Sequence, residues 1–272
     1  MTITFKCKTG EAYHVKVLAE LLANNLKTGC FKVSENGVSL RMFDHHRKTL
    51  VDMDMLAENF SMYKFKLQDP FYLGLNLNHF HKMLKSIKKK DSLQLFINSE
   101  NPNELGIKTI PKENTRITTS SIKIQTIQNL DIDTPSGYNK PVIVPSPEFQ
   151  KMCKDLSSIG STNIHVVAKN FHIEFIADAD GILRRKVAFG ENEDSDDEDS
   201  DDENTEYSAT FSTDQLTRIT KLAGIGNTMQ IFPANNNLPL LFRSSVGSLG
   251  KISIYVKSKE LIEYETHAFE DD

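Results

Sequence analysis

Apolar side chains recur at intervals of three and four residues in four segments, which is the spacing that places them on one face of a helix. The first segment runs from about residue 11 to 25, and Gly29 beyond it is a typical stop signal. In the third segment, Ser146 is expected to be the N-cap and Pro147 the first helical residue. The apolar positions are, in order, Val15, Leu18, Leu21 and Leu22; Leu77, Phe80, Met83, Leu84 and Ile87; Phe149, Met152, Leu156 and Ile159; and Leu216, Ile219 and Leu222.

Each predicted helix is followed by three segments in which apolar and polar residues alternate, as they do in strands with one buried face. Because this order occurs four times, the chain is interpreted as four copies of one unit. Two copies would form a domain of the α+β class, with two helices on one face of an antiparallel sheet. A further strand is predicted at residues 3–7. The strands after the helices are 30–33, 38–41 and 50–55; 93–96, 105–108 and 116–124; 164–167, 171–175 and 181–189; and 229–232, 238–242 and 251–256.

The chain between the second and third units is rich in Pro and Asp and poor in apolar residues, which favours an extended connector. A second interruption is a run of Glu, Asp, Ser and Asn that cannot supply a core, so it is interpreted as a disordered surface loop. The predicted organisation is an N-terminal domain, a connector, a C-terminal domain containing the acidic loop, and an acidic tail. Their ranges are 1–125, 126–145, 146–259 with the loop at 190–206, and 260–272.

Three of the predicted helices carry two cations three residues apart, on the side that faces solvent. One such pair says little, since most exposed helix faces carry one. These pairs, however, recur in register: 151 − 82 = 69, 218 − 151 = 67, and Lys16 lies 82 − 16 = 66 residues before the first pair. The pattern predicts a basic face at an equivalent place in every unit. Its members are Lys16, Lys82, Lys85, Lys151, Lys154, Arg218 and Lys221.

A sheet of this kind has two open edges, and head-to-tail pairing around a rotation axis would use every edge in a closed ring lined by the basic helices. We expect the last strand of the second unit, 116–124, to pair with the last strand of the third unit, 181–189, of the next chain. The apolar residues expected at this subunit interface are Ile117, Ile122, Ile124, Ile182, Val187 and Phe189.

Composition narrows the class of protein further. The net charge of −5 is misleading, because residues 191–206 hold 11 acidic residues; without them the balance is 32 basic against 37 − 11 = 26 acidic, or +6. Three cysteines without a C-x-x-C pair favour a reducing intracellular compartment over a disulfide framework or a metal knuckle. No run of about 18 apolar residues is present, so neither a membrane span nor a membrane partner is expected.

Catalysis is not expected, because no set of acid, base and nucleophile converges. His79 and His81 lie two apart on a predicted helix and point in different directions, and Asp52 and Asp54 lie on the solvent face of a strand. The pair His45-His46 beside Asp44 is the remaining candidate. A phosphate-binding glycine loop is also missing from the sequence. The chain is therefore predicted to be neither an enzyme nor a holder of a cofactor or metal.

Several stretches are specific to one family: PSPEF at 145–149 with CKDLSSIG at 153–160, LGLNL at 73–77, and LPL at 238–240. Over almost its whole length the sequence resembles the proliferating cell nuclear antigen family, the DNA sliding clamps of eukaryotes and archaea. The resemblance implies a homotrimeric ring of six similar domains around duplex DNA, in the nucleus or, for a viral source, in the viral replication compartment. It implies that the recurring cations line the DNA channel. The implied partners are DNA polymerase, the clamp loader, flap endonuclease and DNA ligase, through short peptide motifs.

The resemblance also implies an apolar groove for partner peptides, formed by the connector, a loop of the first domain and the C-terminal end. The matching positions are Phe43, Leu50, Leu130, Ile132, Tyr138, Leu238, Pro239, Tyr255 and Val256. Two departures bear on peptide preference: Arg47-Lys48 where the family commonly has His then Val, and Lys257-Ser258 in place of Ala-Pro. Asp214 also stands where the family usually carries a cation, although Arg218 supplies one a turn later.

Two alternatives stay open within the clamp class. The chain could be one subunit of a heterotrimeric damage-checkpoint clamp (or a second, specialised clamp paralogue), or a monomeric polymerase accessory factor. The second is suggested by Ser120-Ser121, which lacks the aromatic residue that the family often places in its subunit contact.

Overall fold

The computed structural model describes residues 3–113, 116–138, 140–190, 207–234 and 238–268. The predicted acidic loop therefore lies outside the described residues, except for Gly190. The chain divides into two compact units. Unit 1 comprises Met1–Asp133, Gly224–Gly226 and Ser244–Ser253, and unit 2 comprises Thr134–Ala223, Asn227–Arg243 and Ile254–Asp272. The predicted connector 126–145 is thus shared between the units, with residues up to Asp133 in unit 1.

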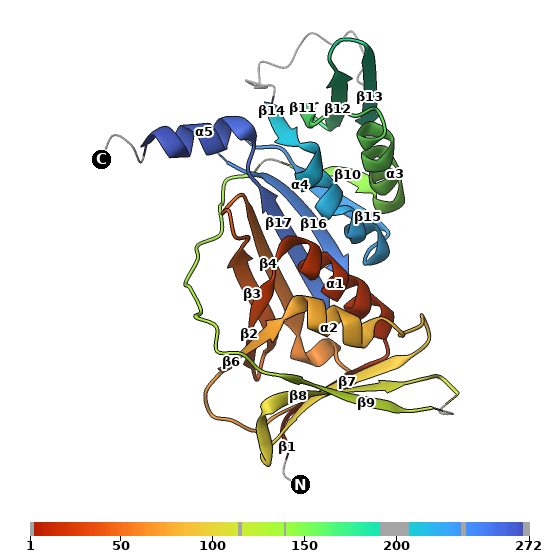
Figure 1. Cartoon of the computed structure of the whole chain (residues 1–272), viewed down its shortest axis with the longest axis vertical. Helices are drawn as coiled ribbons and strands as arrows, with labels where there is room; N and C mark the ends of the chain where they lie inside the picture. The colour runs from red at the N-terminus through yellow and green to blue at the C-terminus, as the bar shows by residue number, and fades with distance from the viewer. Residues whose placement is uncertain (1–2, 114–115, 139, 191–206, 235–237, 269–272) are drawn as a thin grey trace. The chain divides into compact units, whose positions relative to one another are not determined.

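The fourfold repeat and the α+β class are confirmed, with one strand more in the second, third and fourth repeats than the sequence predicted (Figure 1). Every repeat is a strand, a helix and three strands. In chain order these are β1 (Ile3–Thr9), α1 (Ala12–Asn25), β2 (Thr28–Ser34), β3 (Gly37–Phe43) and β4 (Thr49–Leu56); β6 (Phe71–Asn76), α2 (Leu77–Leu84), β7 (Ser92–Asn98), β8 (Asn101–Ile110) and β9 (Thr118–Lys123); β10 (Val142–Pro145), α3 (Ser146–Ser157), β11 (Asn163–Lys169), β12 (His172–Ala179) and β13 (Leu183–Phe189); and β14 (Tyr207–Ser212), α4 (Thr213–Arg218), β15 (Thr228–Phe232), β16 (Leu240–Val246) and β17 (Gly250–Val256). Outside the repeats lie η1 (Ala57–Asn59), β5 (Met62–Phe65), η2 (Thr220–Gly224) and α5 (Lys259–Ala268).

Unit 1 is built on antiparallel strands covered by two helices. One sheet has the order β5-β1-β7-β8-β9, and β4-β3-β2-β6 are neighbours in a second. Helices α1 and α2 pack side by side (Figure 1). Their apolar stripes are buried, with Leu18 and Leu22 of α1 and Phe80 and Leu84 of α2 all at most 6% exposed. These side chains form the core of unit 1 together with Phe5 of β1.

Unit 2 repeats this plan. One sheet has the order β13-β12-β11-β14, and β10-β15-β16-β17 are neighbours in the other. Phe149 of α3 joins the layers, because its ring centroid lies 6.0 Å from that of Phe175 on β12 and 5.6 Å from that of Phe242 on β16. The antiparallel pairing and the helix positions place the basic side of each helix away from this core.

Three details of the predicted helices are wrong. Met83 is expected in the buried stripe, but it is 38% exposed, since Leu77, Phe80 and Leu84 already occupy the inner face of α2. The helix expected to begin after Ser146 begins at that residue, and the Ser146 hydroxyl is buried without a hydrogen-bond partner among the described residues. The fourth helix is α4 followed by the 3-10 turn η2 rather than one continuous helix.

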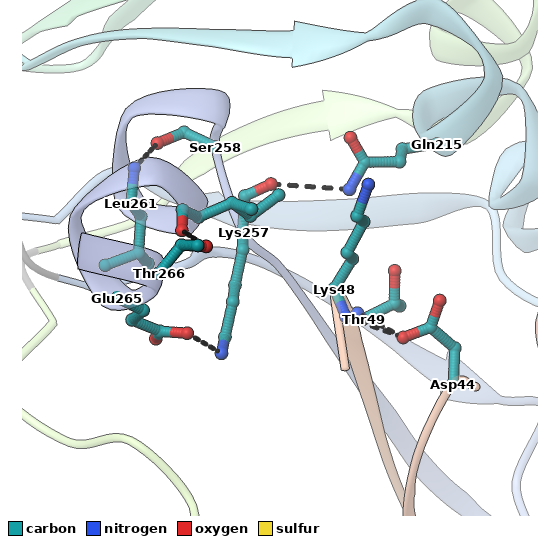
Figure 2. A network of polar contacts seen from close by, with 10 residues as sticks. Asp44, Lys48, Thr49, Gln215, Lys257, Ser258, Leu261, Glu265 and Thr266 are labelled. Atoms are coloured by element: carbon teal, nitrogen blue, oxygen red, sulfur yellow. Dashed lines mark hydrogen bonds and ion pairs between the residues drawn. The ribbon is translucent and has the colours of Figure 1, made fainter. Parts of the chain in front are cut away.

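Part of the predicted acidic tail 260–272 is helix α5, which Figure 2 shows from close by. Ser258 Oγ accepts a hydrogen bond from the Leu261 N–H at 3.1 Å, and the Lys257 ammonium pairs with Glu265. Both carboxylate oxygens of Glu260 accept from the Thr210 N–H at 3.0 Å. Thr210 belongs to β14, the outer strand of its sheet, so α5 is attached to a strand edge.

The Glu260 carboxylate is expected to fasten α5 in a pH-dependent way. Burial opposes its ionisation, but hydrogen bonds from the Thr210 N–H and neighbouring groups outweigh burial and lower its pKa from 4.5. A lowered folded-state pKa means that this stabilisation is present above the unfolded pKa and is lost as the pH falls through the folded pKa. Glu260→Gln should cost α5 docking about 1 kcal/mol at neutral pH. Hydrogen-exchange measurements should show that the Thr210 amide exchanges faster in Glu260→Gln than in the parent. Glu263→Gln, on the exposed side of α5, is the control and should leave the exchange rate of that amide unchanged. Equal exchange rates in the two variants would contradict the assignment.

Candidate nucleic-acid interface and peptide-binding residues

The recurring cations occupy the same position on α2, α3 and α4 and lie within one residue of it on α1. Lys82, Lys151 and Arg218 each lie five residues after the first residue of their helix, since 82 − 77, 151 − 146 and 218 − 213 all equal 5. Lys16 lies 16 − 12 = 4 residues after the first residue of α1. The repeat seen in the sequence is therefore a repeat in helix geometry.

In unit 1, Lys82 and Lys85 are exposed on α2, and no described carboxylate lies within ion-pair distance of either ammonium group. Lys16 is different, because it is half-buried and tethered. Its Nζ donates to the Ile87 carbonyl at 3.0 Å and lies 5.7 Å from the centroid of the Tyr13 ring. Lys16 thus connects α1 to the segment after α2.

Sequence reasoning missed three exposed lysines in the turn between α2 and β7, Lys88, Lys89 and Lys90. The turn is closed by Asp91, whose carboxylate accepts from the Lys88 N–H at 2.9 Å and whose own N–H donates to the Lys88 carbonyl at 3.1 Å. Lys89 Nζ lies 5.8 Å from the centroid of the Tyr13 ring, the same ring that Lys16 approaches. A run of three cations directly after a basic helix was the signal that could have identified them.

In unit 2, Lys151 and Lys154 are exposed on α3, and Met152 and Cys153 between them are buried, as predicted. Burial raises the pKa of the Cys153 thiol to about 12, so the thiol stays protonated at neutral pH. Arg218 forms an exposed ion pair with Asp214 one turn earlier on α4. An exposed pair of this kind is weak, but it offsets part of the positive charge of the fourth repeat.

The residues expected to bind partner peptides in unit 2 form an aromatic cluster. The Tyr138 ring centroid lies 6.3 Å from that of Phe232 and 6.0 Å from that of Tyr255, and the Tyr138 hydroxyl donates to the Pro239 carbonyl at 2.8 Å. Burial, with a smaller contribution from Tyr255, raises the pKa of Tyr138, so it remains a neutral donor. Tyr138 and Leu238 are half-exposed. The other members are buried behind them, Val256 completely, so their side chains form the wall of the cluster.

The corresponding residues of unit 1 are only partly accessible. Leu130 is 53% exposed and Phe43 and Ile132 are half-exposed, but Leu50 is 2% exposed and cannot contact a ligand with its side chain. Arg41 holds the connector, because its Nη1 donates to the Ile132 carbonyl at 3.0 Å while its Nε pairs with Asp52 at 3.1 Å. The accessible apolar side chains of this part are therefore those of the connector and Phe43.

The loop after β3 has a fixed base. The Asp44 carboxylate accepts from the backbone N–H groups of Lys48 at 2.7 Å and Thr49 at 2.9 Å (Figure 2). His45, His46 and Arg47 at its tip are exposed. Asp44 is thus occupied by the backbone, which argues against the acid–base pair that His45 and His46 could have formed with it.

The strands predicted to join subunits lie at the ends of their sheets, β9 in unit 1 and β13 in unit 2. Of the six predicted interface residues, Ile117 and Ile182 are 49% and 84% exposed. Ile122, by contrast, is 7% exposed and packs within its own unit. The Phe189 ring lies 6.1 Å from Phe175 of the neighbouring strand, so part of its surface is also used internally. Ile124 and Val187 are half-exposed.

Within the described residues, no three His, Cys, Asp or Glu side chains come close enough to form a metal-binding group. The described helices include none that is both long and apolar enough to cross a membrane.

Comparison with known proteins agrees with this architecture. The family model of the proliferating cell nuclear antigen N-terminal domain matches residues 4–134, and that of the C-terminal domain matches residues 132–259. A probable DNA polymerase sliding clamp of Paramecium bursaria Chlorella virus 1 is 22% identical over 258 residues, covering 93% of this chain and 96% of that protein. The proliferating cell nuclear antigen of Chaetomium thermophilum is 26% identical over 253 residues, covering 92% and 95%.

The fold agrees as well. The crystal structure of the Entamoeba histolytica proliferating cellular nuclear antigen superposes with a TM-score of 0.80 at 18% identity, covering 95% of this chain and all of that one. Because the two family models together span almost the whole chain, from residue 4 to residue 259, the chain belongs to the proliferating cell nuclear antigen family of DNA sliding clamps.

Proposed function

We propose that three copies of this chain close into a ring around duplex DNA and tether DNA polymerase to it. The observation that carries this proposal is the recurrence of cations near one helical position in all four repeats, exposed in the second, third and fourth and half-buried in the first. A surface that carries Lys and Arg without base-reading partners suits phosphate contacts, which are independent of sequence. The test is whether the purified chain sediments as a trimer and is retained on closed circular DNA but released from the same DNA after linearisation.

The proposed role involves no chemistry by the clamp itself. Partner enzymes, including the clamp loader, flap endonuclease and DNA ligase, would bind through short peptides. Peptides of this type gain affinity from a few apolar anchors. The accessible anchor-binding residues are Phe43, Leu130 and Ile132 in unit 1 and Tyr138 and Leu238 in unit 2. We propose that the protein acts in the nucleus or in the replication compartment of a virus; the support is its similarity to the proliferating cell nuclear antigen of Chaetomium thermophilum and to a viral sliding clamp.

Removing the apolar connector side chains should abolish peptide binding. Leu130→Ser with Ile132→Ser deletes two accessible anchor contacts, each worth about 1 to 2 kcal/mol, so affinity should fall roughly 30-fold or more. Isothermal titration calorimetry with a synthetic peptide carrying one aliphatic and two aromatic anchors measures this. Leu50 is not a suitable target, because it is buried and its replacement would damage the fold.

The matched control is Leu67→Ser with Leu56→Ser, which removes two apolar side chains that are 41% and 46% exposed outside the connector. This variant should bind the peptide as tightly as the parent. If both double variants bind like the parent, the peptide site lies elsewhere.

A further inference from the structure

The lysine-rich turn after α2 adds a basic surface that the recurring helix cations do not account for. The segment from α2 to β7 exposes Lys82, Lys85, Lys88, Lys89 and Lys90. Within the described part of the chain, none of these five forms an ion pair. Asp91 is only 7% exposed and its carboxylate is engaged with the Lys88 backbone N–H, so it closes the turn.

Two contacts fix the position of this turn on the helical layer of unit 1. Lys16 Nζ from α1 donates to the Ile87 carbonyl, and the Tyr13 ring has Lys16 Nζ at 5.7 Å and Lys89 Nζ at 5.8 Å from its centroid. By the triangle inequality the two ammonium groups are at most 5.7 + 5.8 = 11.5 Å apart. The turn therefore brings its charge to the α1 cation rather than away from it.

Two ammonium groups beside one ring, with no carboxylate paired to either among the described residues, repel each other, and a bound anion would offset that repulsion. Lysine binds phosphate as a compact point charge on a flexible stem, and a flexible group of lysines suits a ligand whose phosphates repeat along a backbone. The cation–π contacts with Tyr13 hold the Lys16 and Lys89 side chains beside one ring without neutralising them.

We propose that Lys88, Lys89 and Lys90, together with Lys16, form an accessory phosphate-binding surface that contacts the duplex backbone beside α2. This inference rests on the proposed function, because it assumes that the α2 cations face DNA. The surface increases the positive charge of unit 1, whereas in unit 2 the Asp214 carboxylate offsets Arg218. Unit 1 would then supply the larger share of the backbone contacts.

The test is the salt dependence of binding to a short fluorescein-labelled duplex, measured by anisotropy across a series of NaCl concentrations. Removal of one phosphate contact should reduce the slope of log K against log[salt] by about 0.9. The variant Lys88→Ala, Lys89→Ala and Lys90→Ala should therefore show a slope smaller by about 1 to 3 and at least about tenfold weaker binding at low salt. Its circular dichroism should match the parent, because all three side chains are exposed.

The matched control is Lys32→Ala, Lys64→Ala and Lys66→Ala, which removes the same charge from exposed positions of unit 1 outside this surface. A slope change as large in the control as in the turn variant would overturn the proposal, since it would reflect net charge alone. A second comparison uses Lys82→Ala with Lys85→Ala. If this variant binds DNA more weakly and with a smaller salt slope while the turn variant binds like the parent, the proposal of an accessory surface is wrong and the clamp function stands. If neither variant differs from the parent, the proposed position of the DNA on α2 is wrong as well.

Discussion

Proline at whichever of residues 187 and 188 donates its N–H outward is expected to convert the proposed ring into single chains. Strand β13 pairs with β12 on one side only, with Val187 opposite Phe175 and Ala188 opposite Glu174. Consecutive N–H groups of a strand point to opposite sides, so one of these two residues donates within the chain and the other outward. Proline at the outward position removes a donor that the proposed interface needs and leaves the internal ladder intact.

Sedimentation velocity should show a mass near one chain for the outward-donating position, with far-ultraviolet circular dichroism equal to the parent. The other proline variant serves as its control, because it interrupts the pairing with β12 and should lower the melting temperature. If both the 187 and 188 variants sediment as trimers, a different surface closes the ring.

Removing the α2 and α3 cations is expected to release the clamp from DNA. Lys82, Lys85, Lys151 and Lys154 are exposed, and their replacement by Ala removes 4 × 3 = 12 charges from a trimer. Each phosphate contact contributes about 0.9 to the slope of log K against log[salt]. If a third of these charges contact phosphates, their loss should weaken DNA binding more than about 100-fold at moderate salt. Retention on circular DNA, followed against NaCl concentration, measures the effect.

The control removes as many charges from other exposed positions, two in each unit: Lys32→Ala and Lys64→Ala with Lys169→Ala and Lys259→Ala. In this control, the slope of log K against log[salt] should differ from that of the parent by no more than the contribution of about one phosphate contact. Equal retention of the two variants, both as trimers, would mean that the helix cations do not face the DNA.

The helices were predictable because their signal is local. Period 3.6 marks α1 to α4 in the sequence, and the buried stripes were correct apart from Met83 and from Ile159, which is half-exposed beyond the end of α3. Met83 is apolar and adjacent to the stripe, but one residue is a rotation of about 100° around a helix. Met83 is exposed because Leu77, Phe80 and Leu84 fill the buried face of α2, which the sequence pattern does not show.

The strands were less predictable, because their burial depends on what covers each face. Strands β6, β10 and β14 were missed; β10 is four residues long and lies in the Pro-rich connector. Leu50 was expected in a peptide groove, yet it is covered within its own unit. Ile122 was expected between subunits and is likewise buried. Both residues are apolar, as a residue that contacts a peptide or another subunit would be. Packing within the unit instead buries their side chains against the chain's own core.

The sequence by itself determined the fourfold repeat, the α+β class and the recurring helix cations, because helical periodicity and charge spacing are properties of neighbouring residues. Only the tertiary structure decided which cations come together. Lys16 reaches the carbonyl of Ile87, 71 residues away, and Lys89 reaches the Tyr13 ring, because α1 and α2 pack side by side. Such contacts depend on how two helices pack over a shared core, and the local sequence of one helix does not determine that packing.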